Sequence, residues 1–152
     1  MSALRSLLPV VLCGRTSAIG KPVSQALLPE YEVIHFIQTS EAAQAELPAL
    51  LAGRDPKPTH TNDIGTHEYS KPARAVIFGR GFPLDEVQSL QKACSGINKD
   101  PVAWIVGDPA KAPGPNTPPP GPGYAQVAAN SVKDVLATWA QRGAVKDEII
   151  LY

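Results

Sequence analysis

Two glycines six residues apart, the first at the end of a short apolar run, form the pattern in this chain that most directly indicates a ligand-binding site. Residues 7–20 read LLPVVLCGRTSAIG, so the run ends at Gly14, and Gly20 precedes an amphipathic segment. A strand that ends in such a turn before a helix presents backbone N–H groups to an anion at the helix N-terminus. The pattern predicts a site for the phosphates of a nucleotide. The residues expected to form it are Gly14, Arg15, Thr16, Ser17, Ile19 and Gly20.

The same residues do not fit the P-loop of ATPases and GTPases. The spacing from Gly14 to Gly20 and Lys21 is one residue too long, and Pro22 stands where a serine or threonine would reach magnesium. A tight turn that binds no ligand is the other interpretation, because glycine-bounded turns between strand and helix also occur as purely structural features.

Apolar runs alternate with helical patterns along the chain, which predicts an α/β fold with a parallel sheet between two layers of helices. Runs such as VVLC and AVIF are typical of strands buried on both faces. We expect one Rossmann-like, doubly wound domain over residues 1–152, with strand order 3-2-1-4-5 and the last strand at an edge. Strands are expected at 9–13, 32–37, 74–78, 102–106 and 148–151, with a short third strand near 59–61.

Four helices should connect these strands. They are expected at 21–28, 40–51, 85–94 and 124–141. Ser40 is a good capping residue for the second helix. Pro48 should split or kink that helix, because proline lacks a backbone donor and its ring clashes with the preceding turn. The last helix carries an apolar stripe at spacings of three and four, formed by Ala128, Val132, Val135, Leu136 and Trp139.

The end of the second strand indicates which nucleotide to expect. Ligands of open parallel sheets bind outside the carboxyl ends of the strands. Here the sequence Gln38, Thr39, Ser40 offers no carboxylate for a ribose 2′-hydroxyl. With Arg15 nearby, a phosphorylated ribose fits better than a bare one. We therefore expect NADP(H) rather than NAD, with Thr39 among its contacts.

Two further strand ends carry groups suited to chemistry. After strand 74–78, Gly79 allows close backbone approach and Arg80 adds a guanidinium. A solvated arginine in a glycine turn is the alternative. Asp108 closely follows strand 102–106. It could act as a general base, or it could only form a turn before the next residue, which is a proline.

Residues 13–20, CGRTSAIG, resemble the T-G-x-x-x-G-x-G loop of the short-chain dehydrogenase/reductase family, with Cys13 for the threonine and Ala18 for the middle glycine. The resemblance implies a domain that binds a dinucleotide. It also places Asp63 and Ile64 at the acidic–aliphatic pair that contacts adenine in that family. Residues 62–66 fit an ordinary Asx turn as well.

The catalytic residues of that family are matched only in part. Its general acid is a tyrosine whose pKa is lowered by a lysine four residues later on the same helix. Here Tyr124 opens the last helix, and the fourth residue after it is Ala128. We expect an NADP(H)-binding, reductase-like protein without this pair. If it is an enzyme, it is either an atypical NADP-dependent reductase or catalyses a non-redox isomerisation, elimination or cyclisation of a small molecule through Tyr124, Asp108 or Arg80. A tyrosine that only packs on the core is the alternative for Tyr124.

Two other classes of function fit the chain. The segments AVIFGRGF at 75–82 and VAWIVG at 102–107 resemble small CoA-binding Rossmann domains, in which Gly14, Thr16 and Ser17 would hold the CoA pyrophosphate. The second class is an interaction protein. It would use the proline-rich sequence PAKAPGPNTPPPGP, at 109–122, which favours polyproline geometry and suits docking in an aromatic groove.

Composition and charge limit the partners. The chain has 14 basic and 14 acidic residues, so it lacks the charge excess that binds nucleic acid or an anionic membrane. Its apolar runs are far shorter than the roughly 20 residues of a membrane span, and its N-terminus has no persuasive secretory signal. We expect a cytoplasmic protein, and its apolar edge strands favour a homodimer.

The cysteines and histidines predict neither a disulfide nor a metal site. Cys13 and Cys94 lie far apart among apolar neighbours, so we expect buried, reduced thiols. The pattern H-x-x-D-x-x-x-H at 60–67 has metal-ligand types, but no helix aligns them. His35, in the second strand, is expected to be a hydrogen-bonded core or edge histidine.

Overall fold

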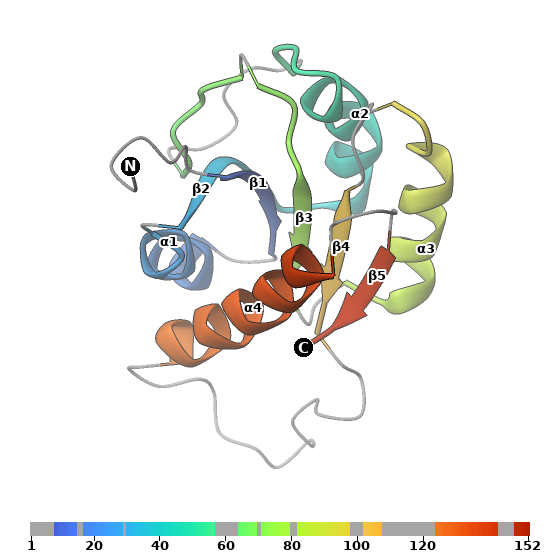
Figure 1. Ribbon diagram of the computed structural model, residues 1–152. Helices are drawn as coiled ribbons and strands as arrows, with labels where there is room; N and C mark the ends of the chain where they lie inside the picture. Colours follow the sequence, from blue (N-terminus) through green and yellow to red (C-terminus); the bar gives the residue numbers. More distant parts are fainter. Residues whose placement is uncertain are drawn as a thin grey trace.

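Five strands form one parallel sheet in the computed structural model (Figure 1), which describes residues 8–14, 17–28, 30–56, 64–69, 71–79, 82–97, 102–107, 124–142 and 148–152. The strands are β1 (Leu8–Cys13), β2 (Tyr31–Ile37), β3 (Ala75–Phe78), β4 (Ala103–Val106) and β5 (Glu148–Leu151). Their order is β2-β1-β3-β4-β5, with every neighbouring pair parallel. This agrees with the predicted order and edge strand, while the strand expected near 59–61 lies outside the described residues.

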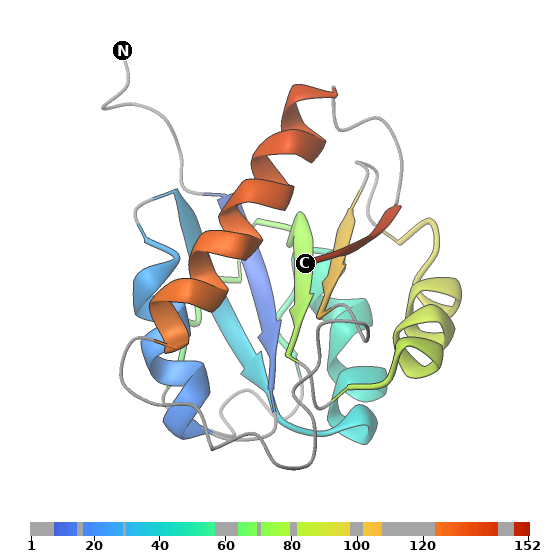
Figure 2. The ribbon, with the colours of Figure 1, turned by 90° about the horizontal axis from the view of Figure 1, so that it is seen from below.

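Four helices cover the two faces of the sheet, so the predicted three-layer, Rossmann-like α/β architecture is confirmed (Figure 2). They are α1 (Ser17–Ala26), α2 (Ser40–Leu51), α3 (Leu84–Ala93) and α4 (Tyr124–Gln141). Helices α1 and α4 pack on one face, and α2 and α3 on the other. Among these described helices, none is long and apolar enough to cross a membrane.

Helix α4 packs against α1, although it connects β4 with β5 at the far side of the sheet. The crossover connections through α1, α2 and α3 all have the same hand. Helix α1 lies on one face of the sheet, and the chain moves through it toward the β2 edge. Helices α2 and α3 lie on the other face, and the chain moves through them in the opposite direction, toward β5. The connection through α4 has the opposite hand, which is rare for parallel strands. The residues that α4 buries are Ala129, Val132, Leu136 and Trp139, so Ala129 rather than the predicted Ala128 is fully buried.

Helix α2 continues through Pro48, contrary to the break predicted there. The carbonyl that loses its donor at this proline belongs to Gln44, which lies on the exposed face, where water can solvate the oxygen. Leucines on the opposite face are buried against the sheet and hold the helix in place. The packing of that face therefore outweighs the local preference of the proline.

A β-bulge in β2 decides which face each side chain of this strand meets. Val10 of β1 pairs with Val33, but the next residue of β1 pairs with His35, so Ile34 is an extra residue in β2. The alternation of side chains shifts at this point. Ile34 and His35 both lie on the α2 side of the sheet, whereas Phe36 lies on the α1 side.

Residues 64–67 lie beside the outer edge of β2. The N–H groups of Thr66 and His67 donate to the carbonyls of Val33 and Ile34, each at 2.9 Å. Gly65 allows this approach, because its φ is +96° and a Cβ there would lie 2.9 Å from backbone atoms of β2. A side chain at position 65 would displace the segment from the bulge.

Candidate functional site

A row of small residues follows the carboxyl ends of the central strands. The register aligns Cys13 of β1 with Phe78 of β3, and Phe78 with Val106 of β4. The residues that come next are Gly14, Gly79 and Gly107. Three glycines therefore follow neighbouring strand ends, at the edge of the sheet where open α/β folds bind their ligands. We call this feature the glycine row.

Gly14 and Gly79 meet at the point where the chain reverses its direction across the sheet. The Gly79 N–H donates to the Cys13 carbonyl at 2.8 Å. A Cβ on Gly79 would lie 3.5 Å from that oxygen and 3.8 Å from the Gly14 Cα, which is ordinary van der Waals contact. The fold itself therefore tolerates a side chain at Gly79, whereas a ligand that approaches the backbone would not.

Gly20 serves the packing of α1 on the sheet. A Cβ at this position would lie 2.4 Å from Cε1 and 2.5 Å from Cζ of Phe36, which is fully buried. The same ring lies close to Gly14, where a Cβ would approach Cε1 to 3.2 Å. In dinucleotide-binding domains the last glycine of the turn has this role, because it lets the helix approach the strand closely.

The helices that start at this edge differ in charge between the two faces. The first turns of α1 and α4 hold no acidic residue. On the other face, α2 begins with Glu41, and α3 begins with Asp85 and Glu86. Helix N-termini attract anions unless carboxylates compete for them. The α1 side of the glycine row is therefore the favourable place for phosphate.

Tyr152 ends the row beyond Gly107. The register pairs Val106 with Leu151, and the Tyr152 N–H donates to the Val106 carbonyl at 3.0 Å. The Tyr152 hydroxyl donates to the carbonyl of Phe78 at 3.0 Å, two strands away. Because neighbouring strands are about 4.8 Å apart, the side chain must cross the end of β4, where Gly107 has no side chain. No sequence pattern indicated this placement.

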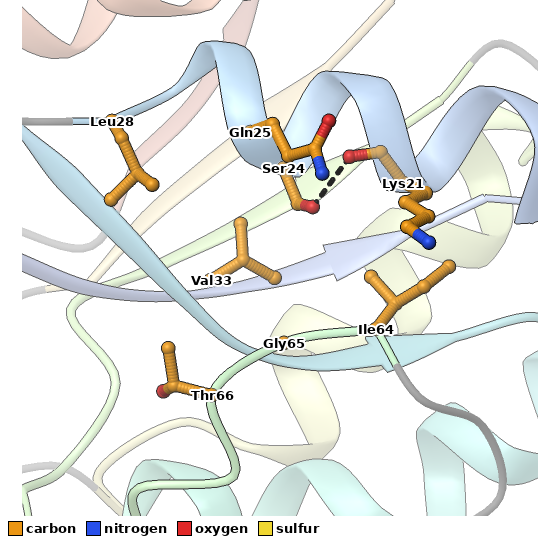
Figure 3. A pocket seen from close by; sticks show the side chains of 8 residues that line it. All are labelled: Lys21, Ser24, Gln25, Leu28, Val33, Ile64, Gly65 and Thr66. Carbon is orange, nitrogen blue, oxygen red and sulfur yellow. Dashed lines mark hydrogen bonds between the residues drawn. The ribbon is translucent and has the colours of Figure 1, made fainter.

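Two of the predicted cofactor contacts lie beside β2. The Thr39 hydroxyl accepts a hydrogen bond from the Ala42 N–H at 3.1 Å, so Thr39, and not the predicted Ser40, is the N-cap of α2. Ile64 lines a cavity of about 190 Å³ between α1 and residues 64–66 (Figure 3). Lys21 faces Ile64 across this cavity, which the apolar side chains of Val33 and Leu28 also line.

The remaining predicted site residues fall wholly or partly outside the described part of the chain. Arg15, Thr16, Asp63, Arg80 and Asp108 are not described, nor are His60 of the metal-type pattern and the proline-rich segment 109–122. The backbone of Ser17 and Ile19 belongs to the first turn of α1, and that of Tyr124 begins α4. Their side chains lie outside the described atoms. The structure thus brings together Gly14, Gly20 and Gly79.

A buried polar cluster lies behind this site, on the α2 side of β2. His35 and Glu46 are 1% and 2% exposed, and Tyr69 is 5% exposed. The His35 Nε2 lies 2.5 Å from Oε1 of Glu46, and its Nδ1 lies 2.8 Å from the Tyr69 hydroxyl. A carboxylate only accepts, so Nε2–H donates to Glu46, and in the neutral ring Nδ1 accepts from Tyr69. Sequence patterns predicted a hydrogen-bonded His35 but neither partner.

The two cysteines are buried and free, as predicted. Burial raises the pKa of the Cys13 thiol far above its ordinary value, and the charge of Glu46 raises it further. Burial also raises the pKa of Tyr69 to about 12, with added effects of Asp55 and Glu46. Neither group is suited to act as a nucleophile near neutral pH.

The buried thiol predicts a loss of stability in alkali. Because the folded protein keeps the Cys13 proton that the unfolded chain releases near pH 9, the stabilisation is complete below that pH and decreases as the pH rises. Wild type should lose about 1.4 kcal/mol per pH unit more than Cys13→Ala above pH 9. Urea unfolding of both proteins from pH 7 to 10.5 measures the difference. Parallel pH profiles would show that the thiol ionises equally in both states.

Comparison with known proteins identifies one informative relative. No model of a protein family matches the chain, and no solved structure matches it. A protein of Aspergillus oryzae described as "Kojic acid related protein 6" is 37% identical over 143 residues. The matched region covers 93% of this chain and 84% of the relative, so the similarity extends over nearly the whole domain.

Proposed function

This chain belongs to the family of Kojic acid related protein 6, and we propose that it binds NADP(H) at the glycine row and catalyses a non-redox reaction of a small molecule beside it. The observation that carries the proposal is the meeting of Gly14 and Gly79 at the reversal point of the sheet, where neither residue has a side chain of its own and the Gly79 N–H donates to the Cys13 carbonyl. Gly20, packed on Phe36, supplies the close approach of helix and strand that dinucleotide sites require.

The charge distribution supports a phosphorylated ligand. The first turns of α1 and α4 are free of acidic residues, and the end of β2 offers Gln38 and Thr39 instead of a carboxylate. A carboxylate there would favour the unmodified ribose of NAD. The pyrophosphate would lie at the N-terminus of α1, where Gly14 allows approach to the backbone.

The reaction proposed is not a hydride transfer. NADP(H) can supply or accept a hydride when bound, but Ala128 occupies the position where the reductase family carries the lysine that activates its tyrosine. The candidates for acid–base chemistry remain Tyr124, Asp108 and Arg80. The name of the relative links that protein with kojic acid, so kojic acid is the first small molecule to test as a second ligand.

Gly79→Ala is expected to weaken NADPH binding at least tenfold without lowering the melting temperature. The added methyl meets only ordinary contacts in the fold, yet it lies over the end of β1 where the ligand approaches. Calorimetric titration with NADPH, NADH, CoA and kojic acid measures the affinities of wild type and variant.

Gln88→Ala, on the exposed face of α3, is the matched control and should bind as wild type does. Wild type that binds none of the nucleotides would refute the proposal. Tight CoA binding with no NADPH binding would replace NADP(H) by CoA. Equal NADPH affinity in wild type and Gly79→Ala would show that NADPH does not bind at the glycine row.

A further inference from the structure

We propose that Tyr152 forms the far wall of the nucleotide site and contacts the nicotinamide half of NADP(H). This inference rests on the proposed function and names a residue for which the sequence offered no role. The described geometry fixes both the position of the side chain and its orientation. Its hydroxyl is held by the Phe78 carbonyl, directly before Gly79 of the glycine row.

The Tyr152 side chain runs across the carboxyl edge of the sheet. Tyr152 starts from β5, and its hydroxyl reaches the last residue of β3. The ring therefore crosses the end of β4 at Gly107. Its core contacts are with the cluster on the α1 and α4 face, the side on which we place the phosphates. The ring and the N-terminus of α1 thus flank the same part of the glycine row.

A dinucleotide bound at the glycine row must lie in one direction across the strand ends. Its pyrophosphate lies at Gly14, and its adenosine half lies toward β2, where Gln38 follows the strand next to β1. The other half must then run over Gly79 toward β4 and β5. The end of β4 lies about 10 Å from the end of β1, since strands are about 4.8 Å apart. At the end of this path the nicotinamide ring meets Tyr152.

The chemistry of the ring suits this contact. Tyr152 is only 9% exposed, and because its hydroxyl is already bonded, the part of the ring that a ligand reaches can offer apolar contact alone. The nicotinamide ring is planar in both redox states, and it carries a positive charge in NADP⁺, which the face of an aromatic ring attracts. A fragment that ends before the nicotinamide, such as 2′,5′-ADP, would not reach the tyrosine.

The test compares the whole dinucleotide with that fragment. NADPH, NADP⁺ and 2′,5′-ADP are titrated into wild type, Tyr152→Leu and Tyr152→Phe, and melting temperatures confirm folding. Tyr152→Leu should weaken NADPH and NADP⁺ about tenfold, while its affinity for 2′,5′-ADP stays within about twofold of wild type. Tyr152→Phe retains the ring but loses the bond to Phe78, so its loss for NADPH should be smaller, about threefold.

Other outcomes separate this inference from the proposed function. Equal losses for NADPH and 2′,5′-ADP would mean that Tyr152 only supports the fold, and unchanged affinities in both variants would place the ring outside the site. Either result overturns the inference while NADP(H) binding stands. Wild type that binds neither NADPH nor 2′,5′-ADP overturns the function and the inference together. If Tyr152→Leu does not fold, the same comparison is decided with Tyr152→Phe.

Discussion

Glu46→Ala is expected to lower the free energy of unfolding by about 3 kcal/mol, the largest loss of any single change considered. The substitution leaves the Nε2–H of His35 without its acceptor in a site where both residues are almost fully buried. The carboxylate that offsets the desolvation of the buried imidazole is then lost. Urea unfolding at pH 7 measures the change.

Glu46→Gln and Gln44→Ala are the matched controls. The glutamine keeps the volume and an oxygen that can accept from His35, so it should lose only about 1 kcal/mol. Gln44→Ala changes an exposed position of the same helix and should stay within about 0.5 kcal/mol of wild type. Equal losses in Glu46→Ala and Glu46→Gln would show that the bond to His35 contributes nothing and that the charge alone matters.

Gly20→Ala is expected to destabilise the fold by about 2 kcal/mol, although alanine is the better helix former. The new methyl would overlap two carbon atoms of the fully buried Phe36 ring, so the ring or α1 must shift. The shift of α1 away from β2 would also disturb the turn at Gly14, so NADPH binding should weaken as well. Chemical unfolding and calorimetric titration measure the two effects.

A double-mutant cycle with Phe36→Leu isolates the cause. Leucine lacks the ring atoms that the methyl would meet, so Gly20→Ala in this background should be neutral or stabilising by up to about 1 kcal/mol. Gln25→Ala, at an exposed position of α1, controls for helix propensity. An equal loss in both backgrounds would mean that Gly20 is needed for its backbone and not for the contact with Phe36.

Local patterns were sufficient to predict the elements of this fold. The strands were expected from short apolar runs and the helices from spacings of three and four. The strand order agrees because connections between parallel strands follow few rules. The failures have tertiary causes. Pro48 does not break α2, because the buried leucines of that helix hold it on the sheet. Helix α4 lies on the face of the sheet that gives its crossover the rare hand. The spacing of its apolar residues does not indicate which face of the sheet it covers.

The candidate site could be predicted only where its parts are close in sequence. Residues 14–20 are continuous in the chain, so their glycine pattern is visible, although α1 begins at Ser17 and not at the predicted residue 21, which places Gly20 within the helix. The alignment of Gly14, Gly79 and Gly107 depends on the register of three strands, and the position of Tyr152 depends on a fourth. Register is set by the packing of both faces of the sheet, which no local pattern contains.

The sequence by itself determined that this protein has an α/β fold with a glycine turn after its first strand, because periodicity and backbone preference are local properties. The tertiary structure decided what the residues around that turn contact. One extra residue in β2, Ile34, places His35 toward Glu46 and Phe36 toward Gly20. Without this extra residue, strict alternation along the strand would place His35 on the α1 side of the sheet and Phe36 on the α2 side. Residues 66 and 67, distant in sequence, donate to the carbonyls of Val33 and Ile34 at this bulge, so a tertiary contact satisfies backbone groups that β1 does not pair.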